Sequence, residues 1–332
     1  MPDATSASSI FESSGAAAEG ETDVSLNTHK PRVAFVGSGG ATKGIAHLGV
    51  MNAMKELGIE TDVYVGASAG AIAGAFFSQG FGVDEMVDWL RPFWLRRGAA
   101  PLRARHFLGA PNAEQWRSPG YLTSGLLSID RFERFLADRL PVNDFRQLSH
   151  KLLVTACDVD GRGRVVFGPG HDEDVPISQA VAASSCSPLL FRPYRIGDRY
   201  YVDGEVIRTL SLDLATAAGA DVIVVSNVYR PHVTRRKHRS LVHSGGAAVG
   251  RQALNIVLSE KEKRGIDLLA RQHPHVTVLN VSADLGNFSF VGRRHARQLL
   301  TRSYREALRL LAAAKQRGVF DVRSNVRAIG KA

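Results

Sequence analysis

Hydrophobic residues form short runs and helical stripes that alternate along most of the chain. Residues 32–36 form an apolar run typical of a short buried strand, and residues 45–57 carry apolar side chains at helical spacing. Further strands are expected, in chain order, at 63–65, 152–157, 164–167, 200–202, 222–227 and 276–281. Further helices are expected from about 69 to 79, near 84–94, at 129–140 and at 293–316. This alternation predicts an α/β domain with a largely parallel sheet.

The first thirty residues do not follow this pattern. Residues 1–30 are rich in Ser, Ala, Gly, Thr and acidic residues, and they carry few large apolar side chains. Such a segment cannot bury enough surface to offset the entropy of ordering it, so we expect a disordered tail. Composition does not change sharply after residue 30, which predicts one folded domain over residues 31–332.

Charge separates the same two parts. The 332 residues include 42 Lys+Arg and 32 Asp+Glu, for a net charge of +10. Residues 1–30 hold five acids and one base (net −4), so residues 31–332 hold 41 bases and 27 acids (net +14). This excess favours partners that carry phosphate, either nucleic acid or an anionic membrane surface.

Several classes of protein are disfavoured by composition. Cys157 and Cys186 are too few for a disulfide framework or a four-cysteine zinc site. Apolar runs are shorter than the ~18–20 residues that a membrane-spanning helix needs. The first residues do not resemble a secretory signal peptide. We therefore expect a cytoplasmic location, with peripheral contact at the inner membrane face.

A glycine-rich turn, residues 37–44, joins the first strand to the first helix. Its backbone N–H groups and the helix N-terminus suit a phosphate or a developing oxyanion. The turn fails both common nucleotide motifs, because Thr42 stands where the Walker A loop and the dinucleotide fingerprint require a small residue. Nucleotide binding is disfavoured, and a purely structural turn is the alternative.

A second motif, G-x-S-x-G, covers residues 66–70. It follows a short apolar strand and opens a helix of small residues, which is the context of a nucleophile elbow. Such a turn is so tight that the neighbours of the serine must be small, which explains Gly66 and Gly70. It also exposes the Ser68 hydroxyl at the end of the strand. The alternative is a serine that only caps the helix.

Asp203 and Gly204 form the third feature, at the end of a short strand. Alone, Asp-Gly marks an ordinary turn. In this order, however, the three features resemble the patatin-like phospholipase family, with its pattern G-G-G-x-[RK]-G, then G-x-S-x-G, then D-G-[GA]. The similarity includes the flanks of the motifs, over about residues 32–228 and less closely to about residue 310.

The resemblance implies a three-layer α/β/α fold and a serine lipid acyl hydrolase that cleaves carboxylic esters of phospholipids or related acyl lipids. It makes Ser68 the nucleophile and Asp203 its base, with no histidine. The backbone N–H groups of Gly39 and Gly40 would form the oxyanion hole. The supporting motif positions are Lys43, Gly44, Gly66, Gly70 and Gly204. The resemblance implies no metal and no cofactor.

Two positions depart from the family pattern. Ala41 stands at the third glycine of the loop, unless Thr42 is an insertion. If that position requires a positive φ, alanine costs about 1 kcal/mol or more. Glu205 follows Asp-Gly, where the family has a small residue. A carboxylate there could raise the pKa of Asp203, but we expect the Glu205 side chain to point to solvent.

Two other readings stay open. A Ser-His-Asp α/β-hydrolase would use a later histidine such as His232, His243 or His273, although that fold usually has more strands before its elbow. A catalytically silent lipid-binding module would fit the changes at Ala41 and Glu205. His47 is expected to be a buried histidine with satisfied hydrogen bonds and no chemical role.

Three surface features bear on the partner. Residues 91–120, near all three tryptophans (Trp89, Trp94, Trp116), combine Arg with aromatic residues and suit a lid or a lipid-docking segment. The basic run 230–239 and the arginines within 293–309 suit anionic lipid head groups. Each is otherwise an ordinary structural or solvated segment. No nucleic acid is expected as a partner, because the sequence shows no nucleic-acid motif beyond its charge.

Overall fold

The computed structural model describes residues 26–89, 127–188, 190–208, 210–228, 240–283, 285 and 296–326. The chain divides into two compact units, one of residues 30–321 and one of both terminal segments. In the terminal unit, β1 (Leu26–His29) pairs antiparallel with β10 (Arg323–Val326). Residues 26–29 thus form a strand within the expected tail, and residues 1–25 lie outside the described residues.

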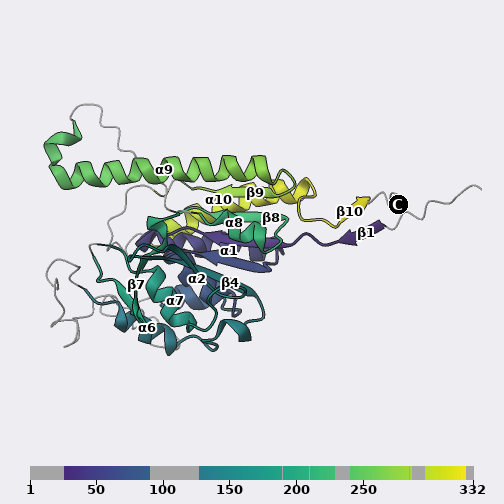
Figure 1. The fold of residues 1–332 in the computed structure, drawn as a ribbon. Helices are drawn as coiled ribbons and strands as arrows, with labels where there is room; N and C mark the ends of the chain where they lie inside the picture. Colours follow the sequence, from purple (N-terminus) through teal and green to yellow (C-terminus); the bar gives the residue numbers. More distant parts are fainter. Residues whose placement is uncertain are drawn as a thin grey trace, which may run out of the picture. The chain divides into compact units, whose positions relative to one another are not determined.

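Within residues 30–321, eight described strands form one mixed sheet in the order β6-β7-β4-β3-β2-β8-β9, with β5 also paired to β4 (Figure 1). The parallel strands are β2 (Val33–Gly37), β3 (Val63–Gly66), β4 (Lys151–Asp158), β8 (Val222–Ser226) and β9 (Thr277–Val281). The antiparallel strands are β5 (Gly163–Phe167), β6 (Tyr194–Ile196) and β7 (Arg199–Asp203). The predicted largely parallel sheet is confirmed.

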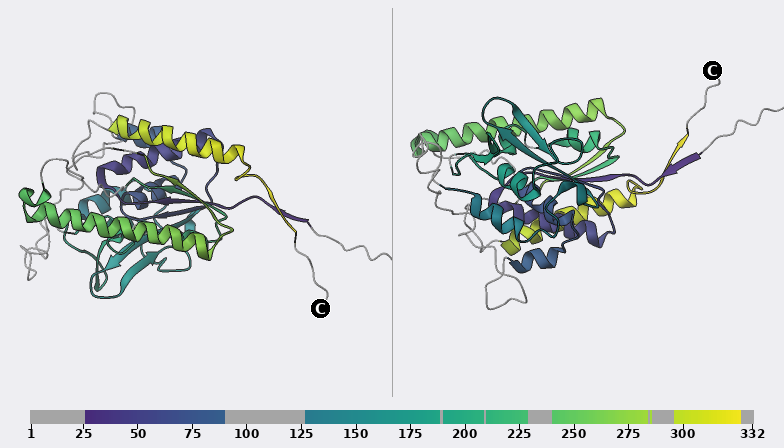
Figure 2. Two further views of the ribbon diagram at one scale, coloured as in Figure 1. Left: turned by 90° about the horizontal axis from the view of Figure 1, so that it is seen from above. Right: turned by 60° about the horizontal axis from the view of Figure 1, so that its bottom comes forward.

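Helices cover both faces of this sheet. The described α-helices of this unit are α1 (Ile45–Glu56), α2 (Ala69–Phe77), α3 (Val83–Trp89), α6 (Asp130–Ala137), α7 (Ile177–Ser184), α8 (Leu212–Ala217), α9 (Gly246–Gln272) and α10 (Ala296–Gln316). Short 3-10 turns lie at η1 (Ala41–Gly44), η3 (Phe145–Gln147), η4 (Gly204–Val206) and η5 (Leu241–Ser244). Figure 2 shows α9 and α10 on opposite sides of the sheet.

The three layers follow from the alternation of side chains along the strands. On β2, Val33 and Phe35 pack into the core cluster that also holds residues of α1, α2, α6, α7 and α10. Ala34 and Val36 point the other way, into the cluster with α8 and the carboxyl-terminal part of α9. Successive side chains of a strand point to opposite faces, so a strand buried on both sides must be apolar throughout, as β2 is.

The sheet also brings the predicted motifs to one edge. Gly37 and Gly66 are register partners at the carboxyl ends of β2 and β3, so the glycine-rich loop and the elbow leave the sheet side by side. From β2 the chain continues to β3 on one side and returns later to β8 on the other. Such a switch in direction opens the crevice where α/β folds bind ligands.

The helix pattern was predicted only in part. Helix α9 was not expected from the sequence. The segments 91–120 and 230–239 lie outside the described residues, so their lipid-docking role stays a prediction. Among the helices that the structure describes, none is long and apolar enough to cross a membrane.

Candidate active site

Ser68 lies at the sharp turn between β3 and α2. Its backbone has φ 52° and ψ −119°, which makes it the one described non-glycine residue with a positive φ. This conformation is strained and persists only where neighbouring contacts impose it. The Ser68 N–H donates to Ser184 Oγ at 2.8 Å, and the Ser184 hydroxyl donates to the Thr155 carbonyl at 2.7 Å. The elbow is thereby fixed to the end of α7 and to β4.

The glycines of the first two motifs are required by backbone contacts. A Cβ on Gly66 would lie 2.4 Å from the Gly70 carbonyl carbon, and a Cβ on Gly70 would lie 2.1 Å from the Gly37 carbonyl oxygen. Gly44 is required by a side-chain contact instead, because a Cβ there would lie 2.5 Å from Ala69 Cβ. No side chain fits where backbones approach this closely. The glycines of the G-x-S-x-G motif are therefore required by the close packing of the elbow and by its contact with the glycine-rich loop.

Asp203 ends β7 and faces Ser68. Its register partner on β4 is Ala156, two residues beyond the partner of Gly66, which places Asp203 above the elbow. Its carboxylate accepts hydrogen bonds from the Ser68 hydroxyl and, at 3.0 Å, from the Glu205 N–H. Gly204 is needed beside it, because a Cβ there would lie 2.3 Å from the Thr155 carbonyl oxygen. The structure thus brings the predicted nucleophile and base together.

Burial sets the charge of this carboxylate. Burial raises the pKa of Asp203 to about 6, against the opposing effect of the hydrogen bonds from Glu205 and Ser68. The group is therefore ionised at neutral pH but close to its titration range. A base of this kind can both accept and return a proton.

The glycine-rich loop is held from beneath by His47. This residue is fully buried, and burial lowers its pKa to about 4, so the ring is neutral. Nε2 lies 2.9 Å from the Ser38 carbonyl, which only accepts, so Nε2 carries the proton. Nδ1 then accepts from the Ser226 hydroxyl at 2.7 Å. His47 positions the loop against β8 through its hydrogen bonds to Ser38 and Ser226, in line with the expectation of a structural role.

The loop itself brings Gly39 beside the nucleophile. A Cβ on Gly39 would lie 3.2 Å from Ser68 Cβ. Gly40 follows, and its carbonyl accepts from the Lys43 N–H at 2.9 Å as the chain enters η1. Ala41 begins this right-handed turn, where φ is negative, so alanine fits without the cost that a positive φ would impose.

The expectation for Glu205 is wrong. Its side chain turns inward instead of toward solvent, and Glu205 Oε1 accepts from the Gly39 N–H at 2.6 Å. Burial and then the Asp203 carboxylate raise the pKa of Glu205 well above its ordinary value. The 3-10 turn η4 causes this orientation, because it carries the chain back across the glycine-rich loop just after Asp203.

Sequence reasoning also missed two positioning residues, Ser184 and Ser226, which lie far from the motifs and carry no pattern of their own. Within the described part of the chain, His, Cys, Asp and Glu do not gather in threes as a metal site would require. The site is built from a serine, carboxylates and backbone N–H groups.

A serine at an elbow, hydrogen-bonded to a buried carboxylate on a three-layer α/β fold, has the arrangement of an acyl hydrolase. The family model for patatin-like phospholipase matches residues 35–216, more than half of the chain. The chain therefore belongs to the patatin-like phospholipase family. This family favours lipid acyl hydrolysis as the activity.

Two relatives each match a little over half of this chain. An uncharacterised NTE family protein of Mycobacterium tuberculosis is 27% identical over 195 residues, which are 58% of this chain and 48% of that protein. Lysophospholipase nte1 of Aspergillus fumigatus is 26% identical over 196 residues, 59% of this chain and 12% of the relative. The matched part of the chain spans about half the length of the Mycobacterium protein and a much smaller share of the Aspergillus protein. The crystal structure of VipD from Legionella pneumophila aligns with a TM-score of 0.43 and 14% identity, over 86% of this chain and 67% of VipD.

Proposed function

We propose that this protein is a serine lipid acyl hydrolase that uses Ser68 and Asp203 as a catalytic dyad. The observation that carries the proposal is the hydrogen bond from the Ser68 hydroxyl to the buried Asp203 carboxylate, at a strained elbow beside the Gly39 N–H. Family membership supplies the substrate class, an acyl lipid with a carboxylic ester.

The reaction would proceed in two steps. Ser68 Oγ attacks the acyl carbonyl carbon while Asp203 takes the hydroxyl proton, and the Gly39 and Gly40 N–H groups stabilise the oxyanion. The tetrahedral intermediate expels the alcohol, which takes the proton from Asp203, and leaves an acyl group on Ser68. Water then attacks that ester while Asp203 takes one of its protons. The bond between the acyl carbon and Ser68 Oγ breaks, Asp203 returns the proton to Ser68 Oγ, and the fatty acid leaves.

Contact with an anionic lipid surface belongs to the same proposal. Exposed arginines of α10, among them Arg297, Arg302 and Arg305, add to the net charge of +14 over residues 31–332. Each Lys or Arg close to an anionic surface adds about 1 kcal/mol to binding. This contact concerns docking and leaves the chemistry to the dyad.

The test is to incubate the protein with mixed phospholipids and lysophospholipids and to measure released fatty acids by mass spectrometry. Ser68→Ala should reduce release by at least about 10³-fold, and Asp203→Ala should do the same, because the two groups act as a unit. Ser78→Ala is the matched control, since Ser78 is a buried serine at the other end of α2. It should keep the activity of the unchanged protein.

Two outcomes would contradict the proposal. Loss of acyl-enzyme formation on replacing His243 or His273 alone would favour a Ser-His-Asp hydrolase. Failure of a fluorophosphonate probe to label Ser68 in the folded protein would favour a silent lipid-binding module.

A further inference from the structure

The Glu205 side chain occupies the corner between the glycine-rich loop and the nucleophile. Glu205 Oε1 accepts from the Gly39 N–H at 2.6 Å. A Cβ built on Gly39 would lie 2.5 Å from Glu205 Cγ and 3.1 Å from its carboxyl carbon, and 3.2 Å from Ser68 Cβ. The carboxyl group of Glu205 and the Ser68 side chain thus approach the same face of Gly39.

This is the place that the proposed reaction assigns to the acyl oxygen. Donors of an oxyanion hole lie about 2.7–3.1 Å from the oxyanion that they stabilise. The Gly39 N–H already serves an oxygen at essentially that distance. One N–H group cannot donate at full strength to two oxygens, so an acyl substrate reaches Gly39 only if the Glu205 carboxyl moves away.

The carboxyl group is held at Gly39 by few interactions. Glu205 Oε2 is buried and makes no hydrogen bond with the described residues. Glu205 also has Asp203 as a neighbouring carboxylate, and Glu262 adds further negative charge. Its neighbour Val206 is 45% exposed, so the turn that carries Glu205 lies at the surface and the path to water is short.

We propose that Glu205 is an internal occupant of the oxyanion site, which the acyl substrate displaces and which competes with fatty-acid carboxylate for the Gly39 N–H. The proposal rests on the function proposed above. A free fatty acid presents the same carboxylate group as the Glu205 side chain. The resting enzyme is therefore slowed toward its substrate, and by the same contact it resists inhibition by its own product.

The experiment compares Glu205→Ala and Glu205→Gln with the unchanged protein. The first readout is the second-order rate of Ser68 labelling by an uncharged fluorophosphonate. The second is the inhibition constant of octanoate, below its aggregation concentration, against hydrolysis of p-nitrophenyl butyrate. Glu60→Ala removes one exposed carboxylate far from the elbow in sequence and controls for net charge.

For Glu205→Ala we expect labelling to be about three- to tenfold faster and octanoate to inhibit at about three- to tenfold lower concentration, the range for one ordinary hydrogen bond. Glu205→Gln keeps the shape and an accepting oxygen but cannot ionise, so both changes should be smaller. Glu60→Ala should match the unchanged protein in both readouts.

Slower labelling of Glu205→Ala at an unchanged melting temperature would overturn the proposal, because Glu205 would then assist catalysis. Equal labelling rates and equal octanoate inhibition would overturn it as well. If Ser68 is labelled in neither protein, the proposed function fails by itself. The Gly39 amide-proton resonance then decides the contact, which is refuted if that resonance does not move in Glu205→Ala.

Discussion

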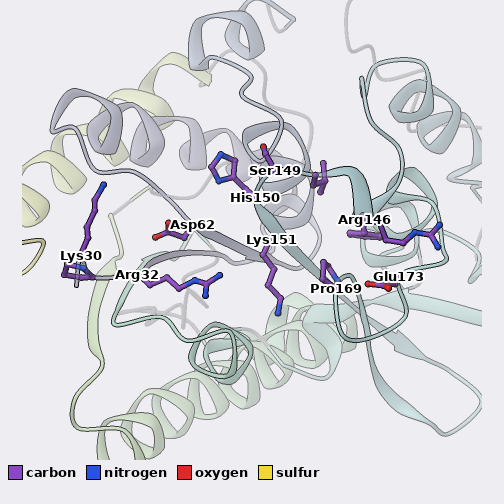
Figure 3. Close-up of a pocket in the computed structure, with 12 residues that line it drawn as sticks. Lys30, Arg32, Asp62, Arg146, Ser149, His150, Lys151, Pro169 and Glu173 are labelled. Atoms are coloured by element: carbon purple, nitrogen blue, oxygen red, sulfur yellow. The ribbon is translucent and has the colours of Figure 1, made fainter. Parts of the chain in front are cut away.

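At the amino ends of β2, β3 and β4, charged side chains lie at the surface and pair with one another or with the backbone. Lys30 forms an ion pair with Glu60, and their side chains are 67% and 77% exposed. Asp62 accepts a 2.8 Å hydrogen bond from the Val33 N–H. Figure 3 shows this end of the sheet, where Arg32, Asp62 and Lys151 are among the residues that line a pocket of about 820 Å³.

Near the carboxyl ends of the same strands, the carboxyl groups of Asp203 and Glu205 are buried. Asp203 and Glu205 form no ion pair with a described residue, and they accept hydrogen bonds from Ser68 and from backbone N–H groups instead. Exposed pairs contribute little to stability because water screens them, whereas buried carboxylates without a cation lower it. One sheet thus separates a hydrated, tolerant end from a strained end that can react.

The largest expected effect breaks the strained end. In Gly70→Ala the new Cβ would lie 2.1 Å from the Gly37 carbonyl oxygen, so the elbow and the glycine-rich loop must separate. We expect a loss of more than about 3 kcal/mol in the free energy of unfolding, measured by urea denaturation, and loss of Ser68 labelling. Gly82→Ala is the control, since no described atom outside the two neighbouring residues lies within 4 Å of its new Cβ. A wild-type midpoint for Gly70→Ala would contradict the contact.

The second effect concerns charge burial. Burial raises the folded-state pKa of Asp203 to about 6, so the folded protein binds the proton more tightly than the unfolded chain does. Stability is therefore lost as pH rises from about 4 to about 6. Asp203→Asn has no carboxyl group at this position and does not lose stability in this way. Its free energy of unfolding, relative to that of the unchanged protein, should therefore be about 2–3 kcal/mol more favourable at pH 7.5 than at pH 4. Urea denaturation at both pH values measures this difference.

Asp213→Asn supplies the opposite sign. Although partial burial acts to raise it, the pKa of Asp213 is held below its ordinary value by Arg164 and Arg208. This carboxylate therefore stabilises the protein at neutral pH. The free energy of unfolding of Asp213→Asn, relative to that of the unchanged protein, should be less favourable at pH 7.5 than at pH 4. The same pH trend in both variants would contradict the contrast between the unpaired carboxylate of Asp203 and the paired carboxylate of Asp213.

The smallest effect is expected for a substitution near the hydrated amino ends of the strands. Asp62→Ala removes one hydrogen bond to the Val33 N–H and should lower the free energy of unfolding by about 1 kcal/mol. The labelling rate of Ser68 should not change, because the two ends share no side-chain contact through Asp62. A slower rate at an unchanged melting temperature would show that the ends are coupled.

The sequence predicts the features that depend on local backbone sterics. The strands and the glycines at 66 and 70 could be recognised because burial on both faces and a tight turn restrict residue type at fixed spacing. Helix α9 could not be recognised in this way. Its apolar residues do not form one buried stripe, since Val249 and Ile256 are exposed while Leu269 packs under the sheet.

The candidate site was predictable for the same reason and only to the same extent. Ser68 and Asp203 follow from motifs that each lie within a few residues. The contact of Glu205 with Gly39 joins positions 166 residues apart, and Ser184 reaches Ser68 across 116 residues. Side-chain direction across such separations is decided by how the turn η4 and the helix α7 pack, which local sequence does not encode.

The position of Glu205 also has a genetic consequence. Every glutamate codon becomes an alanine or a glycine codon through one substitution at its second base. The side chain that contacts Gly39 can therefore be lost in a single mutational event, while the glycines packed around Ser68 leave no comparable route to change. Under the proposal above, such a single change would free the Gly39 N–H for the substrate.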